Sequence, residues 1–230
     1  MIENIIALDK SITLALNSSG SLYADGLMLL ITYTLTWVPV GLVMLYVVFK
    51  NSDMTRFVLV VVALTLCVLF SNGLSELCKA VVGRLRPCVD PSMAPYLHLA
   101  GGYSVGGFGF FSAHAANTMS VAVFLAMLFR RKWLSVFIVL WSLLNGWSRV
   151  YLGVHFLGDV IVGFVVGLIG GLLLYALYAH LTVRLVRGRT GTISETSESE
   201  GLASSDAVLL ETALVLTFAV IAVIATIWLA

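Results

Sequence analysis

Charged side chains are scarce in this chain of 230 residues. Asp, Glu, Lys and Arg together make up 11% of it, apolar residues make up 60%, and the mean hydropathy is +1.03. A soluble domain carries roughly a quarter charged residues, so the shortage excludes an ordinary soluble globular protein and a disordered chain. The formal net charge is only +1, which excludes nucleic-acid binding through bulk positive charge. These numbers are typical of an integral membrane protein.

Cysteine is rare as well. The chain has three, Cys67, Cys78 and Cys88, and their spacing does not match a metal site and allows at most one disulfide. Free cysteine behaves as a small hydrophobe, so we expect all three to be inert apolar residues.

Six stretches approach the ~20 apolar residues that one membrane-spanning helix needs. They are residues 26–49, 57–78, 108–129, 133–148, 156–179 and 207–230. The alternating ten-residue segments of a membrane β-barrel are absent. Ahead of the first stretch, apolar residues repeat at helical spacing: Ile2, Ile5, Leu8, Ile12 and Leu16. Because Glu3, Asp9 and Lys10 interrupt this segment, it does not read as a cleavable signal. We therefore predict an all-α integral membrane protein, a bundle of six transmembrane helices with an N-terminal interfacial helix.

The same pattern divides the chain into four parts. We expect an interfacial amphipathic helix over 1–24, a transmembrane core over 25–180, and an additional C-terminal transmembrane helix over 207–230. Residues 181–206 are predicted to be a flexible cytoplasmic linker, because their second half is rich in Ser, Thr and Glu. Within the core, Gly163, Gly167 and Gly171 fall four residues apart, a pattern that lets another helix approach closely.

The distribution of cations predicts which end of the bundle is cytoplasmic. With six alternating spans, one end carries eight cations: Lys50, Arg56, Arg130, Arg131, Lys132, Arg184, Arg187 and Arg189. The other end carries five: Lys10, Lys79, Arg84, Arg86 and Arg149. The positive-inside rule makes the first end cytoplasmic, so both termini are expected outside.

Six ionisable residues at the ends of the spans gather at this outer end. They are Lys79, Arg86, His114, Arg149, His155 and Asp159. Taken singly, each has an ordinary explanation. Lys79 and Arg86 could be cations that snorkel to the membrane interface, and His114 could be a histidine that packs between helices. His155 and Asp159 could be a structural pair or, less often, metal ligands. Their joint placement favours a functional site, and three nearby cations disfavour a metal ion.

The spacing of these residues suggests how they act. Lys79 and Arg86 share a helical face if the helix continues to Pro87, and Glu76 is expected to pair with Lys79 or Arg84. His155 and Asp159 are four residues apart, so the carboxylate can hold the Nδ1 proton of the imidazole and leave Nε2 free to attack. Three cations suit a group with several anionic oxygens, such as a phosphate.

Three motifs resemble the signature of the type 2 phosphatidic acid phosphatase superfamily. They are Lys79-x6-Arg86-Pro87, Ser112-Ala113-His114 and Ser148-Arg149-x5-His155-x3-Asp159. The first and third match in full, whereas the middle motif has Phe111 and Ala113 where the family usually has Pro and Gly.

This resemblance implies metal-free hydrolysis through a phosphohistidine, with no cofactor. It makes His155 the nucleophile, Asp159 its orienting carboxylate, and His114 the acid that protonates the leaving oxygen and then activates water. Lys79, Arg86, Arg149 and Ser112 would bind the phosphate.

We therefore expect a membrane lipid phosphatase in the plasma (inner) membrane, with its site facing the periplasm or cell exterior. Its substrate would be a lipid phosphate: undecaprenyl diphosphate, lipid A 1-phosphate, phosphatidylglycerol phosphate or phosphatidate. Two alternatives stay open, a phosphotransferase acting between lipids and a non-catalytic transporter or binding protein. Against the second, transporters tend to carry polar groups near the membrane midplane. No residue decides the oligomeric state.

Overall fold

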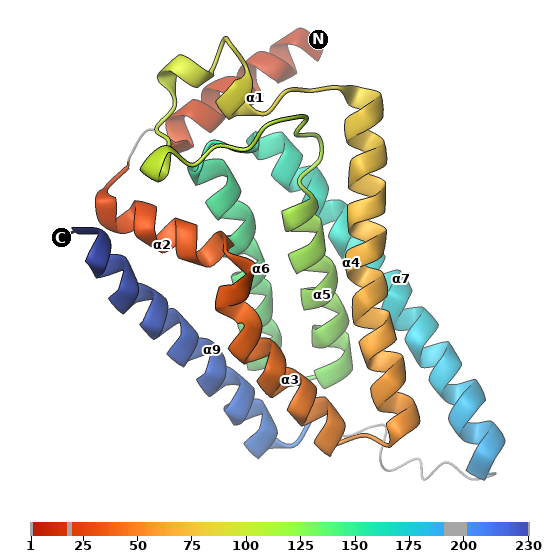
Figure 1. Cartoon of the computed structure of the whole chain (residues 1–230). Helices are drawn as coiled ribbons and strands as arrows, with labels where there is room; N and C mark the ends of the chain where they lie inside the picture. Colours follow the sequence, from red (N-terminus) through yellow and green to blue (C-terminus); the bar gives the residue numbers. More distant parts are fainter. Residues whose placement is uncertain (1, 18–19, 191–201, 230) are drawn as a thin grey trace.

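The computed structural model describes residues 2–17, 20–190 and 202–229, and in these ranges the chain is helical with no β-strand. The predicted all-α class is confirmed. The main helices are α1 (Ile2–Asn17), α2 (Leu22–Thr32), α3 (Val38–Lys50), α4 (Met54–Val82), α5 (Ala113–Phe129), α6 (Lys132–Tyr151), α7 (Leu157–Thr190) and α9 (Ser204–Ala225). Short 3₁₀ turns occupy Thr34–Trp37, Thr226–Leu229 and three places in the long loop between α4 and α5. Figure 1 shows α3 to α7 and α9 running between two ends of one bundle.

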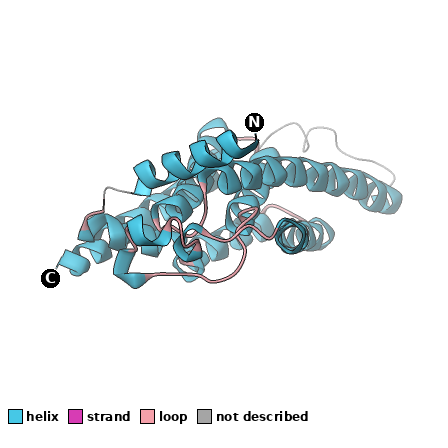
Figure 2. Cartoon of the chain, turned by 90° about the horizontal axis from the view of Figure 1, so that it is seen from above, coloured by secondary structure: helices cyan, strands magenta, loops and turns pink. Residues whose placement is uncertain are grey.

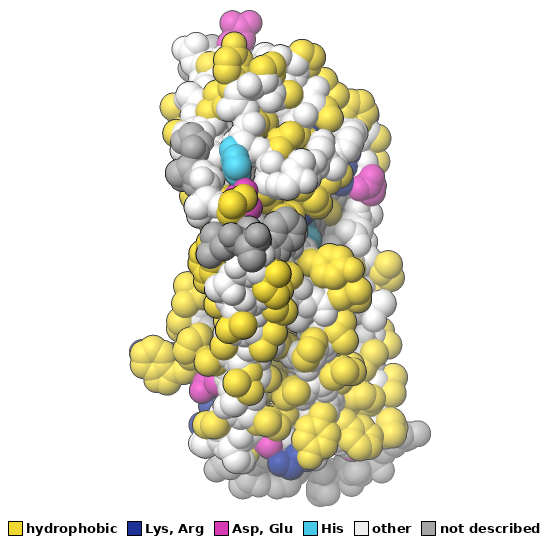
Figure 3. Space-filling view, turned by 60° about the vertical axis from the view of Figure 1, so that its left-hand side comes forward, with side chains coloured by type: hydrophobic (Ala, Val, Ile, Leu, Met, Phe, Trp, Pro, Cys, Tyr) yellow, Lys and Arg dark blue, Asp and Glu magenta, His cyan; other side chains and the backbone are white. Residues whose placement is uncertain are grey.

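The long apolar helices identify an integral membrane protein. Four of them, α4, α6, α7 and α9, have the length and hydropathy to cross a membrane, and α2 with α3 makes a fifth if the pair forms one span. Hydrophobic side chains cover the middle of the face in Figure 3, and charged side chains lie towards its ends. Helix α5 has 17 residues, fewer than the ~20 of a typical span. Six spans require that both α5 and the bent pair cross, which stays a prediction.

The first predicted span is not one straight helix. Residues 26–49 fall on α2 and α3, which are bent by 70° relative to each other. The break is at Tyr33, whose backbone is extended (φ −78°, ψ 116°), and Pro39 occupies the first turn of α3, where its missing N–H costs no helical hydrogen bond. The indole N–H of Trp37 donates to the Ile31 carbonyl at 2.8 Å, which satisfies a group that the break leaves without a helical partner. Hydropathy alone could not reveal this break, because both halves are equally apolar.

The glycine stripe acts as the sequence predicts. Helices α5 and α7 lie side by side (Figure 1). A Cβ atom added at Gly163, Gly167 or Gly171 would lie 2.5–2.6 Å from a backbone carbonyl oxygen of α5 or its N-cap residue. The two backbones are therefore in direct contact, which only glycine at these positions permits.

Helix α1 lies across the end of the bundle where the long loop and the α6–α7 turn meet (Figures 1 and 2). Its apolar side chains Ile5 and Leu8 are 62% and 59% exposed, whereas its polar residues Thr13 and Asn17 are fully buried. Thr13 and Asn17 thus point into the protein and Ile5 and Leu8 away from it, whereas Leu16 at the end of the apolar stripe packs against buried core residues. The interfacial position of α1 on a membrane stays a prediction.

The predicted boundaries after the core differ from the observed ones. Helix α7 continues to Thr190, so the first part of the expected 181–206 linker is helical. Residues 191–201 lie outside the described residues. Helix α9 begins at Ser204, and its Asp206 accepts hydrogen bonds from Lys50 (2.7 Å) and Asn51 (2.9 Å). These bonds fix the start of α9 to the end of α3.

Candidate active site

The first motif leaves helix α4 earlier than predicted. Gly83 follows Val82 with φ +61°, a left-handed conformation that favours glycine and ends a helix. Its N–H donates to the Lys79 carbonyl. The helix therefore does not continue to Pro87, which was the condition for placing Lys79 and Arg86 on one helical face. Arg86 reaches the site from the loop instead.

His155 and Asp159 meet at the turn between α6 and α7. The His155 Nδ1 atom lies 3.5 Å from Asp159 Oδ2, which is longer than a well-formed hydrogen bond. The other ring nitrogen, Nε2, lies 3.0 Å from Nη1 of Arg86. A guanidinium only donates, so Nε2 must be the acceptor and Nδ1 carries the proton. This tautomer directs the Nε2 lone pair towards the cation, where a phosphoryl group would be held.

The surroundings favour a neutral His155. Burial, together with the charges of Arg86 and Arg149, lowers the pKa of His155 to about 4, although Asp159 acts in the opposite direction. Burial and the nearby Arg149 also lower the pKa of Arg86. A histidine that is uncharged at neutral pH can act as a nucleophile. Burial destabilises the charged guanidinium of Arg86, and a bound anion would stabilise it.

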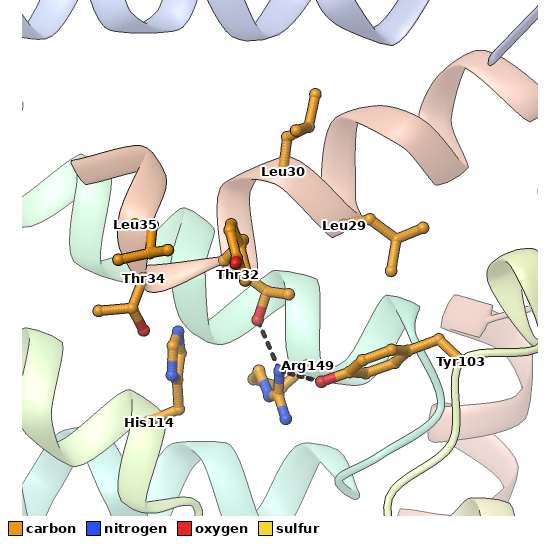
Figure 4. A pocket seen from close by; sticks show the side chains of 9 residues that line it. Leu29, Leu30, Thr32, Thr34, Leu35, Tyr103, His114 and Arg149 are labelled. Carbon is orange, nitrogen blue, oxygen red and sulfur yellow. Dashed lines mark hydrogen bonds between the residues drawn. The ribbon is translucent and has the colours of Figure 1, made fainter. Parts of the chain in front are cut away.

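Arg149 and His114 line a cavity of about 560 Å³ beside the break between α2 and α3. Figure 4 shows both side chains pointing into it, with leucines of α2 and the following turn around its edge. Arg149 Nη1 donates to the hydroxyls of Thr32 (2.6 Å) and Tyr103 (3.4 Å). His114 Nε2 lies 3.4 Å from Asn145 Oδ1. The cavity thus combines a cation and a histidine with an apolar wall.

Ser112 begins helix α5 as its N-cap. Its side chain accepts from the Ala115 N–H at 3.4 Å, and its own N–H donates to the Asp159 carbonyl at 3.0 Å. The first turn of α5, which carries His114, is thereby joined to the first turn of α7. Nearby, a Cβ at Gly109 would lie 3.0 Å from Asp159 Oδ2, so the loop backbone runs directly against the site.

Lys79 is the predicted residue that the structure does not bring into contact with the others. Its ammonium pairs with Glu76 at 2.6 Å, which is the first of the two partners expected for Glu76. No hydrogen bond or ion pair within the described ranges joins Lys79 to His155 or to either arginine. The structure gathers the remaining predicted residues: His155, Asp159, Arg86, Arg149, His114 and Ser112.

Several residues of the site were not singled out from the sequence. Arg84 donates to Asp159 Oδ1 at 3.0 Å, although the sequence offered only Glu76 as its partner. Thr32, Tyr103 and Asn145 hold Arg149 and His114 in place. Of these four residues, only Arg84 could have been identified from the sequence, because it lies inside the first motif. The other three are ordinary polar residues in segments distant from the motifs.

The two guanidiniums are arranged to receive an anion. Arg86 and Arg149 are each only 8% exposed, and the described residues place no carboxylate in an ion pair with either. The Nε atoms of both have no hydrogen-bond partner there. A buried cation without a counter-charge is costly, and a phosphate supplies both the charge and the acceptors. No group of three or more His, Cys, Asp or Glu residues that could hold a metal ion occurs in the ranges the structure covers.

A buried histidine beside an arginine, a second buried arginine and a second histidine lie together at one end of a helical membrane bundle, an arrangement suited to binding and transferring a phosphoryl group. Residues 57–182, more than half of the chain, match the model of the PAP2 superfamily. The chain belongs to this superfamily, and the family predicted from the three motifs is confirmed. The predicted class of activity, a membrane lipid phosphatase, is confirmed as well.

The chain is similar in sequence to two lipid phosphatases. A lipid A 4′-phosphatase of Bacteroides thetaiotaomicron is 38% identical over 187 residues, which cover 80% of this chain and 83% of the relative. A lipid A 4′-phosphatase of Porphyromonas gingivalis is 34% identical over 185 residues, which cover 79% of this chain and 78% of the relative.

Two crystal structures share the fold. LpxE from Aquifex aeolicus has a TM-score of 0.59 at 21% identity, covering 72% of this chain and 93% of that one. A transmembrane PAP2-type phosphatidylglycerolphosphate phosphatase from Bacillus subtilis has a TM-score of 0.58 at 22% identity, covering 81% and 90%. Both likenesses concern the helical architecture.

Proposed function

We propose that this protein removes the 4′-phosphate of a lipid A-type glycolipid through a phosphohistidine intermediate on His155. The observation that carries the chemistry is the pair of buried guanidiniums near His155, Arg86 and Arg149, which form no ion pair with a carboxylate among the described residues. The observation that favours this substrate is the similarity to two lipid A 4′-phosphatases at 38% and 34% identity. The sequence-based expectation included lipid A 1-phosphate among several lipid phosphates. We now favour lipid A over the others, with the 4′-phosphate rather than the 1-phosphate as the group that is removed.

In the first step, His155 Nε2 attacks the phosphorus atom and the bond from phosphorus to the sugar oxygen breaks. Arg86 and Arg149 hold the equatorial oxygens, whose charge must be stabilised during phosphoryl transfer. We assign Lys79 the same task, which requires its ammonium to turn from Glu76 towards the phosphate. His114 donates its proton to the leaving oxygen, so that the dephosphorylated lipid departs as an alcohol.

In the second step, His114 accepts a proton from water while the water oxygen attacks the phosphohistidine. The N–P bond breaks, inorganic phosphate leaves, and His155 regains its starting tautomer. Asp159 supports both steps, because its carboxylate favours the proton on Nδ1 and keeps Nε2 as the reacting atom. We assign Ser112 an assisting role in phosphate binding through the N-terminus of α5, since unpaired N–H groups at such a terminus favour anions.

We infer an inner-membrane location with the site facing the periplasm. The proposal is supported by eight cations on the opposite side of the bundle against five on this one, a bias that the positive-inside rule reads as cytoplasmic. The lipid's acyl chains would stay in the outer leaflet of that membrane while its head group enters the cavity past the leucines of α2.

Phosphate release by the full chain in detergent, with EDTA present, tests the proposal. Lipid A, undecaprenyl diphosphate and phosphatidylglycerol phosphate would be compared, with His155→Ala as the inactive control. Mass-spectrometric fragmentation of the lipid A product should show loss of the 4′-phosphate. Release from phosphatidylglycerol phosphate but not lipid A would overturn the substrate, and no release from any lipid would overturn the activity.

A further inference from the structure

A stripe of three polar residues on α1 contacts the turn that carries the proposed nucleophile. Asp9, Thr13 and Asn17 are four residues apart, so they share one face of the helix. Thr13 Oγ1 accepts from Leu157 N–H (3.1 Å) and Asp9 Oδ1 accepts from Gly158 N–H (2.9 Å). Asn17 Nδ2 donates to the Tyr151 carbonyl at 2.6 Å. The N–H groups at the start of a helix have no partner within it, so α1 caps α7 from outside.

Arg84 extends this contact to the catalytic carboxylate. Its Nη2 donates to Asp9 Oδ2 at 2.7 Å, and its Nη1 donates to Asp159 Oδ1 at 3.0 Å. The guanidinium also lies 3.7 Å from the centre of the Phe156 ring. One planar cation therefore bridges a carboxylate from α1 and the carboxylate that faces His155.

The bridge fixes the orientation of Asp159. The Asp159 carboxylate is fully buried. Its Oδ1 accepts from Arg84, while its Oδ2 accepts from the Phe156 N–H at 3.1 Å and faces His155 Nδ1 at 3.5 Å. Asp9 in turn holds the far side of the guanidinium and shares its positive charge. Without Asp9, Arg84 would be held, among the described residues, only by Asp159 and the Phe156 ring, and Asp159 would be the only carboxylate left to balance its charge.

We propose that Asp9 and Arg84 are positioning residues for phosphoryl transfer: through Asp159 they hold the His155 imidazole in its attacking tautomer and orientation. The inference rests on the proposed function and deepens it. It makes α1 part of the catalytic apparatus, although the superfamily match begins only at residue 57. At metal sites, outer-shell groups that orient a histidine ligand contribute about 10- to 100-fold, and we expect an effect of the same order here.

The competing explanation is that Asp9 merely ties α1 to the bundle, and the neighbouring residue provides a matched control. Lys10 also joins α1 to the site end, by an ion pair with Asp90 at 2.8 Å and a hydrogen bond to Ser92 at 2.7 Å. No hydrogen bond or ion pair among the described residues joins Lys10 to the α6–α7 turn. Lys10→Gln thus removes a comparable tether without touching the bridge to Asp159.

A second variant disturbs the bridge without removing a polar group. A Cβ atom at Gly158 would lie 2.9 Å from Asp9 Oδ2 and 3.3 Å from Asp9 Cγ. Gly158→Ala therefore displaces the Asp9 carboxylate, which is the movable partner. Asp9→Glu keeps the charge and should restore part of what Asp9→Asn loses.

The experiment measures kcat and KM for lipid A and the melting temperature of each full-length variant in detergent. Asp9→Asn and Gly158→Ala should lower kcat about tenfold or more with KM changed less than about twofold, as expected when only the reacting geometry is lost. Lys10→Gln should leave kcat unchanged at a similar melting temperature. Equal losses of kcat in Asp9→Asn and Lys10→Gln, or unchanged kcat in Asp9→Asn, would overturn the inference.

A readout independent of turnover separates this inference from the proposed function. Histidine ¹⁵N NMR, with the His155 signals assigned by a His155→Gln variant, reports which ring nitrogen carries the proton. Asp9→Asn should reduce the population with the proton on Nδ1, and Lys10→Gln should not. If wild-type protein hydrolyses no lipid phosphate, the proposed function fails. If wild type is active and the tautomer is the same in Asp9→Asn, only the role of Asp9 and Arg84 fails.

Discussion

Replacing Gly163 with alanine should damage both the stability of the bundle and its chemistry. The added Cβ would lie 2.6 Å from the Ser112 carbonyl oxygen and 3.1 Å from the Ala115 Cβ. Ordinary van der Waals contact begins at 3.4 Å, so α7 and the start of α5 must separate by roughly 0.8 Å. The oxygen belongs to backbone, which cannot turn aside as a side chain would.

The size of the two effects follows from this displacement. Overpacking of a well-filled interior costs about 1–3 kcal/mol. The displaced segment also carries Ser112 and His114, and a misplacement approaching 1 Å near reacting groups can cost about 100-fold in rate. We expect Gly163→Ala to lower the melting temperature and to reduce kcat between about 10- and 100-fold.

Two other glycines separate the effects. A Cβ at Gly171 would lie 2.6 Å from the Ser120 carbonyl, two turns further along α5, so Gly171→Ala should destabilise the bundle equally and retain activity. A Cβ at Gly73 in α4 meets nothing within 4 Å, so Gly73→Ala should raise stability by up to about 1 kcal/mol. Thermal unfolding in detergent and phosphate release measure both quantities. If Gly163→Ala and Gly171→Ala lose activity equally, or neither is destabilised, the reasoning is refuted.

Three further predictions concern charge and sidedness. Because the pKa of His155 is lowered to about 4, the ring should be about 90% neutral at pH 5, against about 3% for an unperturbed histidine; a ¹⁵N NMR titration showing a midpoint near 6.5 would contradict this. Activity should survive EDTA, because fixed cations stabilise the phosphoryl oxygens; loss of activity that Mg²⁺ restores would show that Arg86 and Arg149 are not sufficient. The last test uses sealed cells and a background that lacks the three native cysteines. A cysteine introduced at Ser92 should react with a membrane-impermeant thiol reagent, and one introduced at Ser194 should react only after the cells are permeabilised. The reverse pattern would mean that the site faces the cytoplasm.

The chemistry-bearing residues were predictable where local spacing determines contact. His155 and Asp159 are close because four residues along a helical turn bring side chains together, and Glu76 meets Lys79 for the same reason at a spacing of three. The glycine stripe predicted a close helix pair, although not which helix would be the partner. These inferences need no knowledge of tertiary structure.

The remaining features depend on contacts between distant segments. Arg84 binds both Asp9 and Asp159, each 75 residues away from it in the sequence, whereas the sequence suggested only the nearby Glu76 as its partner. Thr32 reaches Arg149 only because the chain breaks after α2. Hydropathy did not predict the break itself, because it is averaged over a window that includes both α2 and α3. A single sequence carries no signal for such pairings between distant segments.

The length of α5 has a consequence for the depth of the reaction. Its 17 residues span roughly 25 Å at 1.5 Å per residue, less than the ~30 Å hydrocarbon thickness of a typical bilayer. In Figure 1 its first turn, which carries His114, begins below the upper end of α4. If the end of α5 away from the site sits at one boundary of the hydrocarbon layer, the site residues lie a few ångströms beneath the other boundary. Turnover in reconstituted vesicles should then vary with acyl-chain length, and thinner bilayers should bring lipid phosphates closer to the buried arginines.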